Sequence, residues 1–203
     1  MSVRLKICGI RRDEDVGLLN RFLPDYAGFV FASSKRQIDV KTAVRLRSLL
    51  DARIRTVGVF VDASLEEVET AVQSGAISMV QLHGNEDESY IQTLKAKCDV
   101  PVIKAVRMNG KEEVSLLSFP SASCFLLDSG AGSGQTFDWK KESVTDKPLF
   151  IAGGIGSSNL QAAIEFFHPY AVDVSSSVET DGYKDEEKIR KLVETLHRLT
   201  GES

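Results

Sequence analysis

Short, almost wholly apolar runs recur along this chain at intervals of about 21 to 30 residues. They lack the apolar–polar alternation of a strand with one face in water, and near-continuous apolar runs are typical of parallel strands buried on both faces. The predicted strands are Arg4–Cys8, Tyr26–Phe31, Thr56–Val61, Met79–Leu82, Val102–Val106, Cys124–Asp128, Leu149–Ala152 and Ala171–Val174.

Apolar stripes with helical spacing lie between several of these runs. The stripes are Leu65, Val68, Ala71 and Val72; Leu160, Ala163, Ile164 and Phe167; and Ile189, Leu192, Val193, Leu196 and Leu199. Gly75 is predicted to end the first of these helices, and Asn159 or Ser158 to cap the second. Eight strands alternating with helices predict an α/β fold, a closed (β/α)8 TIM barrel. The alternative is an open doubly wound sheet, which normally carries a Gly-rich nucleotide-binding turn after its first strand, and Cys8-Gly9-Ile10-Arg11-Arg12 is no such turn.

Composition narrows the class of protein further. The 203 residues are 42% hydrophobic and 27% charged, and no linker-like stretch divides them, so we expect a single domain over residues 1–203. The net charge of −4 with dispersed Lys and Arg predicts no nucleic-acid partner, and no apolar stretch reaches the ~20 residues that span a bilayer. Three widely spaced cysteines and the absence of a signal segment favour a cytoplasmic location. No clear exposed apolar face is evident, so a monomer is favoured over a homodimer.

In barrels of this kind the active site forms at the carboxyl ends of the strands. Cys8 ends the first predicted strand. A free cysteine is most often a small buried hydrophobe, so its position alone leaves a structural role open. To act as a base, a thiol with an ordinary pKa of about 8.5 needs positive potential nearby. Lys6, Arg11 and Arg12 are cations near to it in the sequence.

Asp128 ends the sixth predicted strand and is followed by the glycine-rich run Gly130-Ala131-Gly132-Ser133-Gly134. Enclosure and a nearby phosphate would both raise the pKa of this carboxyl from about 3.9, as a general acid requires. Capping of a neighbouring helix is the alternative role for such a residue.

The ends of the last two predicted strands carry residues suited to phosphate. Gly153 and Gly154 follow the seventh strand, and Ser175 and Ser176 follow the eighth. Barrels often bind phosphate with these two loops, because backbone N–H groups without obstructing side chains can approach the anion.

Four further polar residues are candidates for binding a substrate. Gln81, His83 and Asp173 lie at or near strand ends, and Arg36 lies in the long loop after the second strand, where its guanidinium could hold a carboxylate. A solvated surface arginine and a hydrogen-bonded pocket-wall histidine are the alternatives. With one strand-end histidine, we expect no metal site.

Eight short motifs occur along the chain in the order found in a known family. They are Lys6-Ile7-Cys8-Gly9-Ile10, Gly28-Phe29-Val30-Phe31, Val57-Gly58-Val59-Phe60-Val61, Val80-Gln81-Leu82-His83-Gly84, Leu126-Leu127-Asp128-Ser129, Phe137-Asp138-Trp139, Ala152-Gly153-Gly154-Ile155 and Val172-Asp173-Val174-Ser175-Ser176. Each is weak alone, whereas their order and spacing from about residue 4 to Asp185 are specific. The chain resembles phosphoribosylanthranilate isomerase of tryptophan biosynthesis.

The resemblance implies an aldose–ketose isomerase that needs no cofactor. Its reaction would be the Amadori rearrangement of N-(5-phosphoribosyl)anthranilate to 1-(2-carboxyphenylamino)-1-deoxyribulose 5-phosphate, the third step from chorismate to tryptophan. In the family, the aspartic acid matching Asp128 protonates the ribose ring oxygen, and the cysteine matching Cys8 removes the proton at C2. The arginine matching Arg36 holds the anthranilate carboxylate, and the loops after the seventh and eighth strands hold the phosphate.

The chain departs from the family pattern at two positions. Lys35 replaces the usual proline before Arg36, which should loosen the loop that presents the guanidinium. Ser177 replaces the usual glycine, and if the backbone there needs a positive φ, serine costs about 1 kcal/mol or somewhat more. Two alternatives remain: another phosphosugar barrel isomerase, of the histidine pathway or acting on both substrates, and a non-catalytic barrel that binds a phosphorylated ligand.

Overall fold

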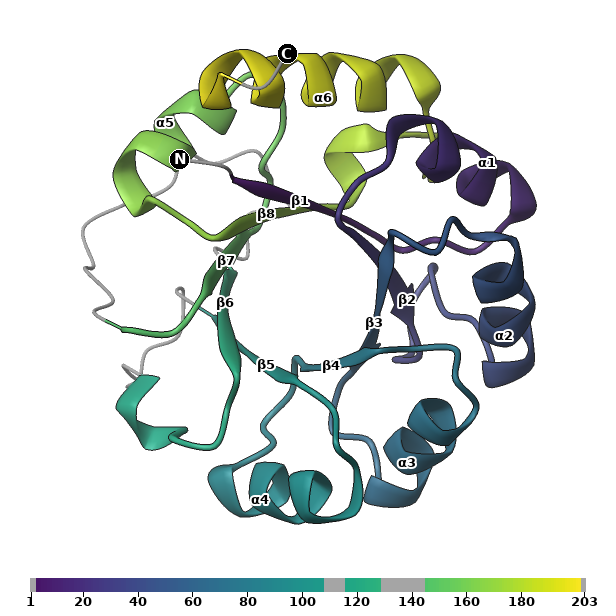
Figure 1. Cartoon of the computed structure of the whole chain (residues 1–203), viewed down its shortest axis with the longest axis vertical. Coiled ribbons are helices and arrows are strands. Elements are labelled where there is room, and N and C mark those ends of the chain that lie inside the picture. The colour runs from purple at the N-terminus through teal and green to yellow at the C-terminus, as the bar shows by residue number, and fades with distance from the viewer. Residues whose placement is uncertain (1–2, 108–115, 129–144, 202–203) are drawn as a thin grey trace.

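The computed structural model describes residues 3–107, 116–128 and 145–201. Eight parallel strands close into a barrel in the order of the sequence, because β8 pairs with β1 (Figure 1). The strands are β1 (Arg4–Cys8), β2 (Tyr26–Val30), β3 (Arg55–Phe60), β4 (Met79–Leu82), β5 (Val102–Arg107), β6 (Cys124–Asp128), β7 (Leu149–Ala152) and β8 (Ala171–Val174). The predicted closed barrel is confirmed.

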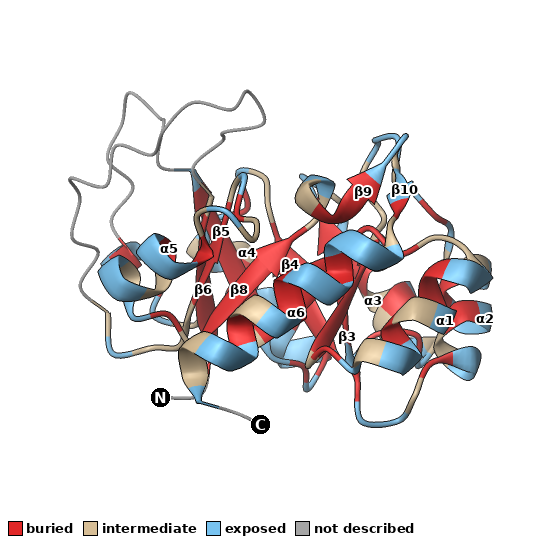
Figure 2. Ribbon diagram, turned by 90° about the horizontal axis from the view of Figure 1, so that it is seen from above, coloured by how far each residue is buried: buried red, intermediate tan, exposed pale blue. Residues whose placement is uncertain are grey.

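Helices surround the strands. They are α1 (Asp13–Phe22), α2 (Val40–Leu49), α3 (Leu65–Gln73), α4 (Glu88–Lys97), α5 (Leu160–Phe167) and α6 (Glu186–Thr200), with the short 3-10 helices η1 (Leu116–Ser118) and η2 (Ser176–Val178). A small antiparallel hairpin of β9 (Glu179–Thr180) and β10 (Tyr183–Lys184) follows η2. In Figure 2 the strands and the inward helix faces are buried, while the outward helix faces are exposed. None of the helices in these described ranges is both long enough and apolar enough to cross a bilayer.

The strands bury both of their faces, as the apolar runs predict. On β1, Leu5 and Ile7 point outward into the core beneath the helices. The opposite face of the other strands fills the barrel interior with a second apolar cluster, which includes Tyr26, Leu126 and Phe150. Because side chains alternate along a strand, Lys6 and Cys8 share the inward face of β1. A charged residue and a thiol therefore stand where most neighbouring strands place apolar side chains.

The strand ends differ from the prediction by one residue at three strands. Phe31 and Val61 lie just beyond β2 and β3, and β3 begins at Arg55 rather than Thr56. β5 includes Arg107 because that residue pairs with Asp128. Phe31 still donates its N–H to the Val59 carbonyl oxygen at 2.9 Å, so the parallel ladder frays gradually.

The predicted helix ends are partly right. Gly75 has φ +73° immediately after the Ser74 C-cap of α3, so the predicted glycine does end that helix. Asn159 precedes α5, but its side chain does not cap that helix. Its Oδ1 accepts from the Gly156 N–H at 2.8 Å and its Nδ2 donates to the Gly154 carbonyl at 3.1 Å, so it braces the loop after β7 instead.

Candidate active site

A cavity of about 410 Å³ opens at the carboxyl ends of the strands. Its lining comes from the ends of all the strands except β5 and from the loops that follow them. All the residues singled out from the sequence line it: Cys8, Arg36, Gln81, His83, Asp128, Gly153, Gly154, Asp173, Ser175 and Ser176. The glycine-rich run 130–134 and the motif Phe137-Asp138-Trp139 lie outside the described residues.

Cys8 ends β1, and its sulfur occupies a space left by a glycine on the neighbouring strand. Gly28, its partner on β2, leaves the space that the thiol fills, since a Cβ added there would lie 2.6 Å from Sγ. The Cys8 carbonyl oxygen accepts from the Ser175 hydroxyl at 3.0 Å, which ties β1 to the loop after β8. Burial and, more weakly, Asp173 raise the pKa of the Cys8 thiol, and these effects outweigh the lowering by Lys6 and Lys184.

Lys6 lies one layer below Cys8 and is fully buried. Its Nζ donates to Oδ2 of Asp173, its register partner on β8, at 2.5 Å. Burial lowers the pKa of Lys6, but the neighbouring Asp173 and Cys8 raise it by more, so the ammonium is kept charged. Oδ1 of Asp173 is buried, with no hydrogen-bond partner among the described residues.

Asp128, at the end of β6, belongs to a chain of three side chains. Its Oδ2 lies 3.0 Å from His83 Nε2, and His83 Nδ1 lies 2.9 Å from Gln81 Nε2. Because an amide nitrogen only donates, this arrangement places the imidazole proton on Nε2, which donates to the Asp128 carboxylate. Gln81 Oε1 is buried, without a partner in the described part of the chain.

Arg36 does not extend into solvent. Its Nε and Nη2 donate to the two oxygens of Glu179 at 2.7 and 2.6 Å, and Lys184 donates to the same carboxylate at 2.8 Å. Gly9, with φ +86°, leaves the space across which the Arg36 side chain lies. Since Glu179 occupies the Nε edge of the guanidinium, the opposite edge, formed by Nη1 and Nη2, is the one left for a ligand.

Glu179 and Lys184 were not predicted from the sequence. Both are buried, and both come from the β9–β10 hairpin, which follows the predicted phosphate loop. Of the three cations considered for Cys8, Lys6 faces it. Arg11 instead donates to the carbonyls of Lys35 and Gly182, and Arg12 pairs with Asp15.

The loops after β7 and β8 meet at one side of the cavity. Gly153 and Gly154 have φ of +91° and +71°, which side chains rarely tolerate, so this turn requires glycine. The loop after β8 runs through Ser175 directly into η2. Both loops therefore bring backbone close to the cavity.

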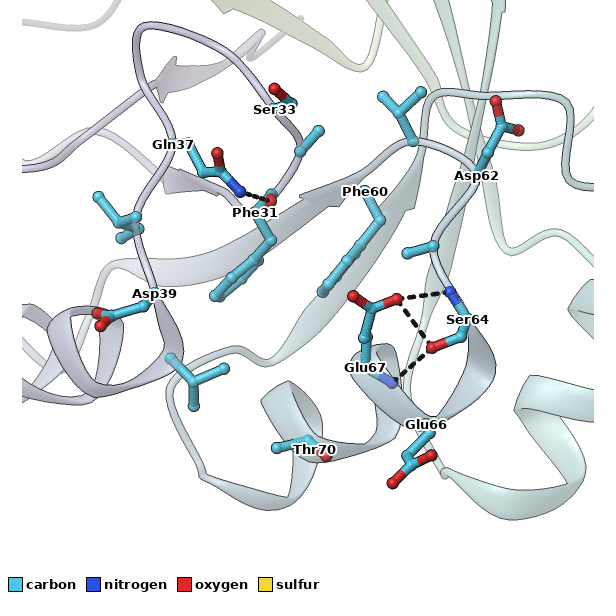
Figure 3. A pocket seen from close by; sticks show the side chains of 15 residues that line it. Phe31, Ser33, Gln37, Asp39, Phe60, Asp62, Ser64, Glu66, Glu67 and Thr70 are labelled. Carbon is cyan, nitrogen blue, oxygen red and sulfur yellow. Dashed lines mark hydrogen bonds between the residues drawn. The ribbon is translucent and has the colours of Figure 1, made fainter.

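A second hollow of about 570 Å³ lies beside the first, between the loops after β2 and β3 (Figure 3). Phe31 and Phe60 stack in it with their ring centroids 4.9 Å apart. Two of its carboxylates already have local partners: Asp39 accepts from the first turn of α2, and Glu67 forms a capping box with Ser64. It holds none of the acid, base or arginine groups described above. Within the described ranges, no group of three or more His, Cys, Asp or Glu side chains is placed to hold a metal ion.

Comparison with known proteins settles the family. A model of the N-(5′-phosphoribosyl)anthranilate (PRA) isomerase family matches residues 5–195. This chain belongs to the PRA isomerase family. A PRA isomerase of Endomicrobium trichonymphae is 45% identical over 201 residues, covering 97% of this chain and 99% of that protein.

Solved PRA isomerases share the fold. The Thermus thermophilus crystal structure is 33% identical, covers 97% of this chain and 100% of that one, and superposes with a TM-score of 0.86. Another, solved with reduced 1-(o-carboxyphenylamino)-1-deoxyribulose 5-phosphate bound, is 32% identical over 98% of this chain and 99% of that one, with a TM-score of 0.83.

The structure shows how the chain accommodates its two departures from the PRA isomerase pattern, at Lys35 and Ser177. Around Lys35 the loop is fixed, since Arg11 donates to the Lys35 carbonyl at 2.7 Å and Glu179 holds Arg36. Ser177 lies in η2 and is not among the described residues with positive φ, so the strain considered for serine does not arise. Its Cβ faces Gly156, where an added Cβ would lie 3.1 Å away, so a small residue opposite makes room for the serine.

Proposed function

We propose that this chain converts N-(5-phosphoribosyl)anthranilate to 1-(2-carboxyphenylamino)-1-deoxyribulose 5-phosphate in tryptophan biosynthesis, without a cofactor. One observation carries the proposal: an acid candidate, Asp128, and a base candidate, Cys8, line one cavity together with Arg36 and the loops after β7 and β8. β7 and β8 separate the strands that bear the two groups, so the acid and the base reach a bound sugar from different positions on the rim.

The first step is ring opening. Asp128 gives its proton to the ribose ring oxygen, the bond from C1 to that oxygen breaks, and the anthranilate nitrogen forms a Schiff base with C1. The chain of Gln81, His83 and Asp128 suits this role. The Nε2–H of His83, 3.0 Å from Oδ2, donates to the Asp128 carboxylate and so stabilises the anion that remains once the proton has been given up.

The second step is removal of the C2 proton. Cys8 takes this proton as a thiolate, the C1–C2 bond gains double-bond character, and the resulting enolamine tautomerises to the ketone. Asp173 lines the cavity, and its Oδ1 has no partner among the described residues, so this oxygen is available to accept a hydrogen bond from a sugar hydroxyl and hold the substrate in place.

The two ends of the substrate are charged, and the cavity has a partner for each. The carboxylate of the anthranilate ring binds the Nη1–Nη2 edge of Arg36, since Glu179 holds the other edge. The phosphate binds the backbone of Gly153, Gly154, Ser175 and Ser176.

The test is turnover of phosphoribosylanthranilate generated in situ, followed by loss of its fluorescence. The wild-type chain is expected to turn it over, and Cys8→Ala and Asp128→Asn each to lower kcat by at least ~100-fold while still binding a product analogue. Turnover no faster than the spontaneous rate would favour a ligand-binding barrel. Equal turnover of the histidine-pathway aminoaldose would favour an isomerase with two substrates.

A further inference from the structure

Lys6 is a buried lysine that has no role in the mechanism proposed above. It is fully enclosed in the barrel, and its Nζ donates to Oδ2 of Asp173 at 2.5 Å. Burying an ion pair carries a large desolvation cost, and well-packed apolar residues often replace such pairs without loss of stability. The pair is thus poorly explained by stability alone.

The position of Lys6 relative to Cys8 gives a reason for it. The two residues are i and i+2 on one strand and share its inward face. Gly28 on β2 leaves room for the sulfur, and a larger residue there would push the thiol out of its place. Asp173 on β8 holds the Lys6 ammonium in place, so a fixed positive charge lies on the same face of β1 as the Cys8 thiol.

The other charged groups around Cys8 come from two loops. Lys184 on β10 and Arg36 after β2 both act on the thiol electrostatically, and Glu179 binds both of these cations. With Lys6 and Asp173 included, three cations and two carboxylates surround the sulfur, so the cluster carries a net charge of +1 before the thiol ionises. A thiolate would neutralise it.

Two further groups act on this cluster from a greater distance. His83 on the loop after β4 and Asp128 on β6 both influence Asp173. Burial raises the pKa of Cys8, and among the groups that oppose this effect Lys6 is the strongest. The pKa of Cys8 is raised overall, so Lys6 offsets part of the burial effect, and its loss would raise the pKa of the thiol further.

We infer that Lys6 is a positioning residue: its ammonium, anchored by Asp173, stabilises the Cys8 thiolate and holds it where a base is needed. The catalytic consequence rests on the proposed function, whereas the effect on thiol ionisation does not.

The test is the pH dependence of Cys8 alkylation by iodoacetamide in Lys6→Met, because the thiolate is the form that reacts. Mass spectrometry of the Cys8 peptide separates this signal from those of Cys98 and Cys124. The alkylation midpoint is expected to rise by at least about one pH unit, a tenfold smaller thiolate fraction below it. The rising limb of the pH profile of kcat/KM is also expected to shift to higher pH in Lys6→Met.

Lys104→Met is the matched control. Lys104 is also a buried strand lysine, paired with the buried Glu86 at 3.0 Å, but it does not line the cavity. Its loss imposes a similar structural penalty and should leave the Cys8 midpoint unchanged. A merely structural role for Lys6 predicts the same small effect in both variants.

If Lys6→Met does not fold, the double variant Lys6→Met/Asp173→Asn removes both charges and leaves no unpaired buried carboxylate. Its Cys8 midpoint is still expected above that of the wild type, since Lys6 acts on the thiol more strongly than Asp173 does. An unchanged midpoint in the folded variant overturns the inference, even if the wild-type chain turns over the substrate. A shifted midpoint without wild-type turnover would support it and reject the proposed function instead.

Discussion

Gly28 offers a direct way to displace the thiol of Cys8 without altering its chemistry. A Cβ at position 28 would lie 2.6 Å from Sγ, 2.9 Å from Cα and 3.1 Å from Cβ of Cys8. Ordinary contacts are about 3.5–4.0 Å, so Gly28→Ala requires the sulfur to move by about 1 Å. A displacement of that size at a reacting group can lower the rate about 100-fold, and overpacking costs typically 1–3 kcal/mol of unfolding free energy.

The assay measures kcat by loss of substrate fluorescence and stability by urea unfolding. Gly17→Ala is the matched control, because Gly17 lies in α1 with nothing within 4 Å of an added Cβ. It should leave kcat unchanged and stabilise the chain by about 0.5–1 kcal/mol, as alanine does in a helix. Wild-type kcat and stability in Gly28→Ala would refute the claim that the Cys8 sulfur depends on the space left by Gly28.

Three further predictions follow from named contacts. Arg36→Lys should raise KM for phosphoribosylanthranilate at least ~10-fold with a smaller effect on kcat, because lysine lacks the planar fork, and an unchanged KM would exclude Arg36 as the carboxylate partner. Burial raises the pKa of Glu179, but Arg36 and Lys184 lower it by more, so its stabilisation is complete above the ordinary value of about 4.3 and is lost as the pH falls through the depressed pKa. Urea midpoints should therefore separate wild type from Glu179→Gln at pH 7 more than at pH 3, and an equal gap would count against that ion pair. Gly84→Ala should lower the unfolding free energy by about 1–3 kcal/mol, since an added Cβ would lie 2.6 Å from the Asp62 nitrogen, and thermal unfolding identical to the wild type would show that the loop yields freely.

The fold could be predicted because its determinants are local. Each strand is a continuous apolar run, and the runs alternate with helical stripes, so periodicity predicts an eight-strand α/β fold. The absence of a Gly-rich turn after the first strand then favours a closed barrel over an open sheet. Cys8 and Asp128 were recognisable for the same reason, since each ends such a run and strand ends converge at one rim.

The partners of these groups were not predictable in the same way. Glu179 and Lys184 reach Arg36 from a hairpin far along the chain, and the pairing of distant loops leaves no local pattern. Lys6 carried a clearer signal, because a lysine inside an apolar run must be buried with a partner. The sequence shows that such a partner is needed but does not identify Asp173, which the barrel closure between β1 and β8 brings into register.

The central claim is that Cys8 removes the proton at C2 of the opened sugar. The most direct measurement is release of deuterium from substrate labelled at C2, followed in the wild type and in Cys8→Ala. The account predicts release at the turnover rate in the wild type and release at least ~100-fold slower in Cys8→Ala. Deuterium release at the wild-type rate in Cys8→Ala would contradict it and would assign the base to another group.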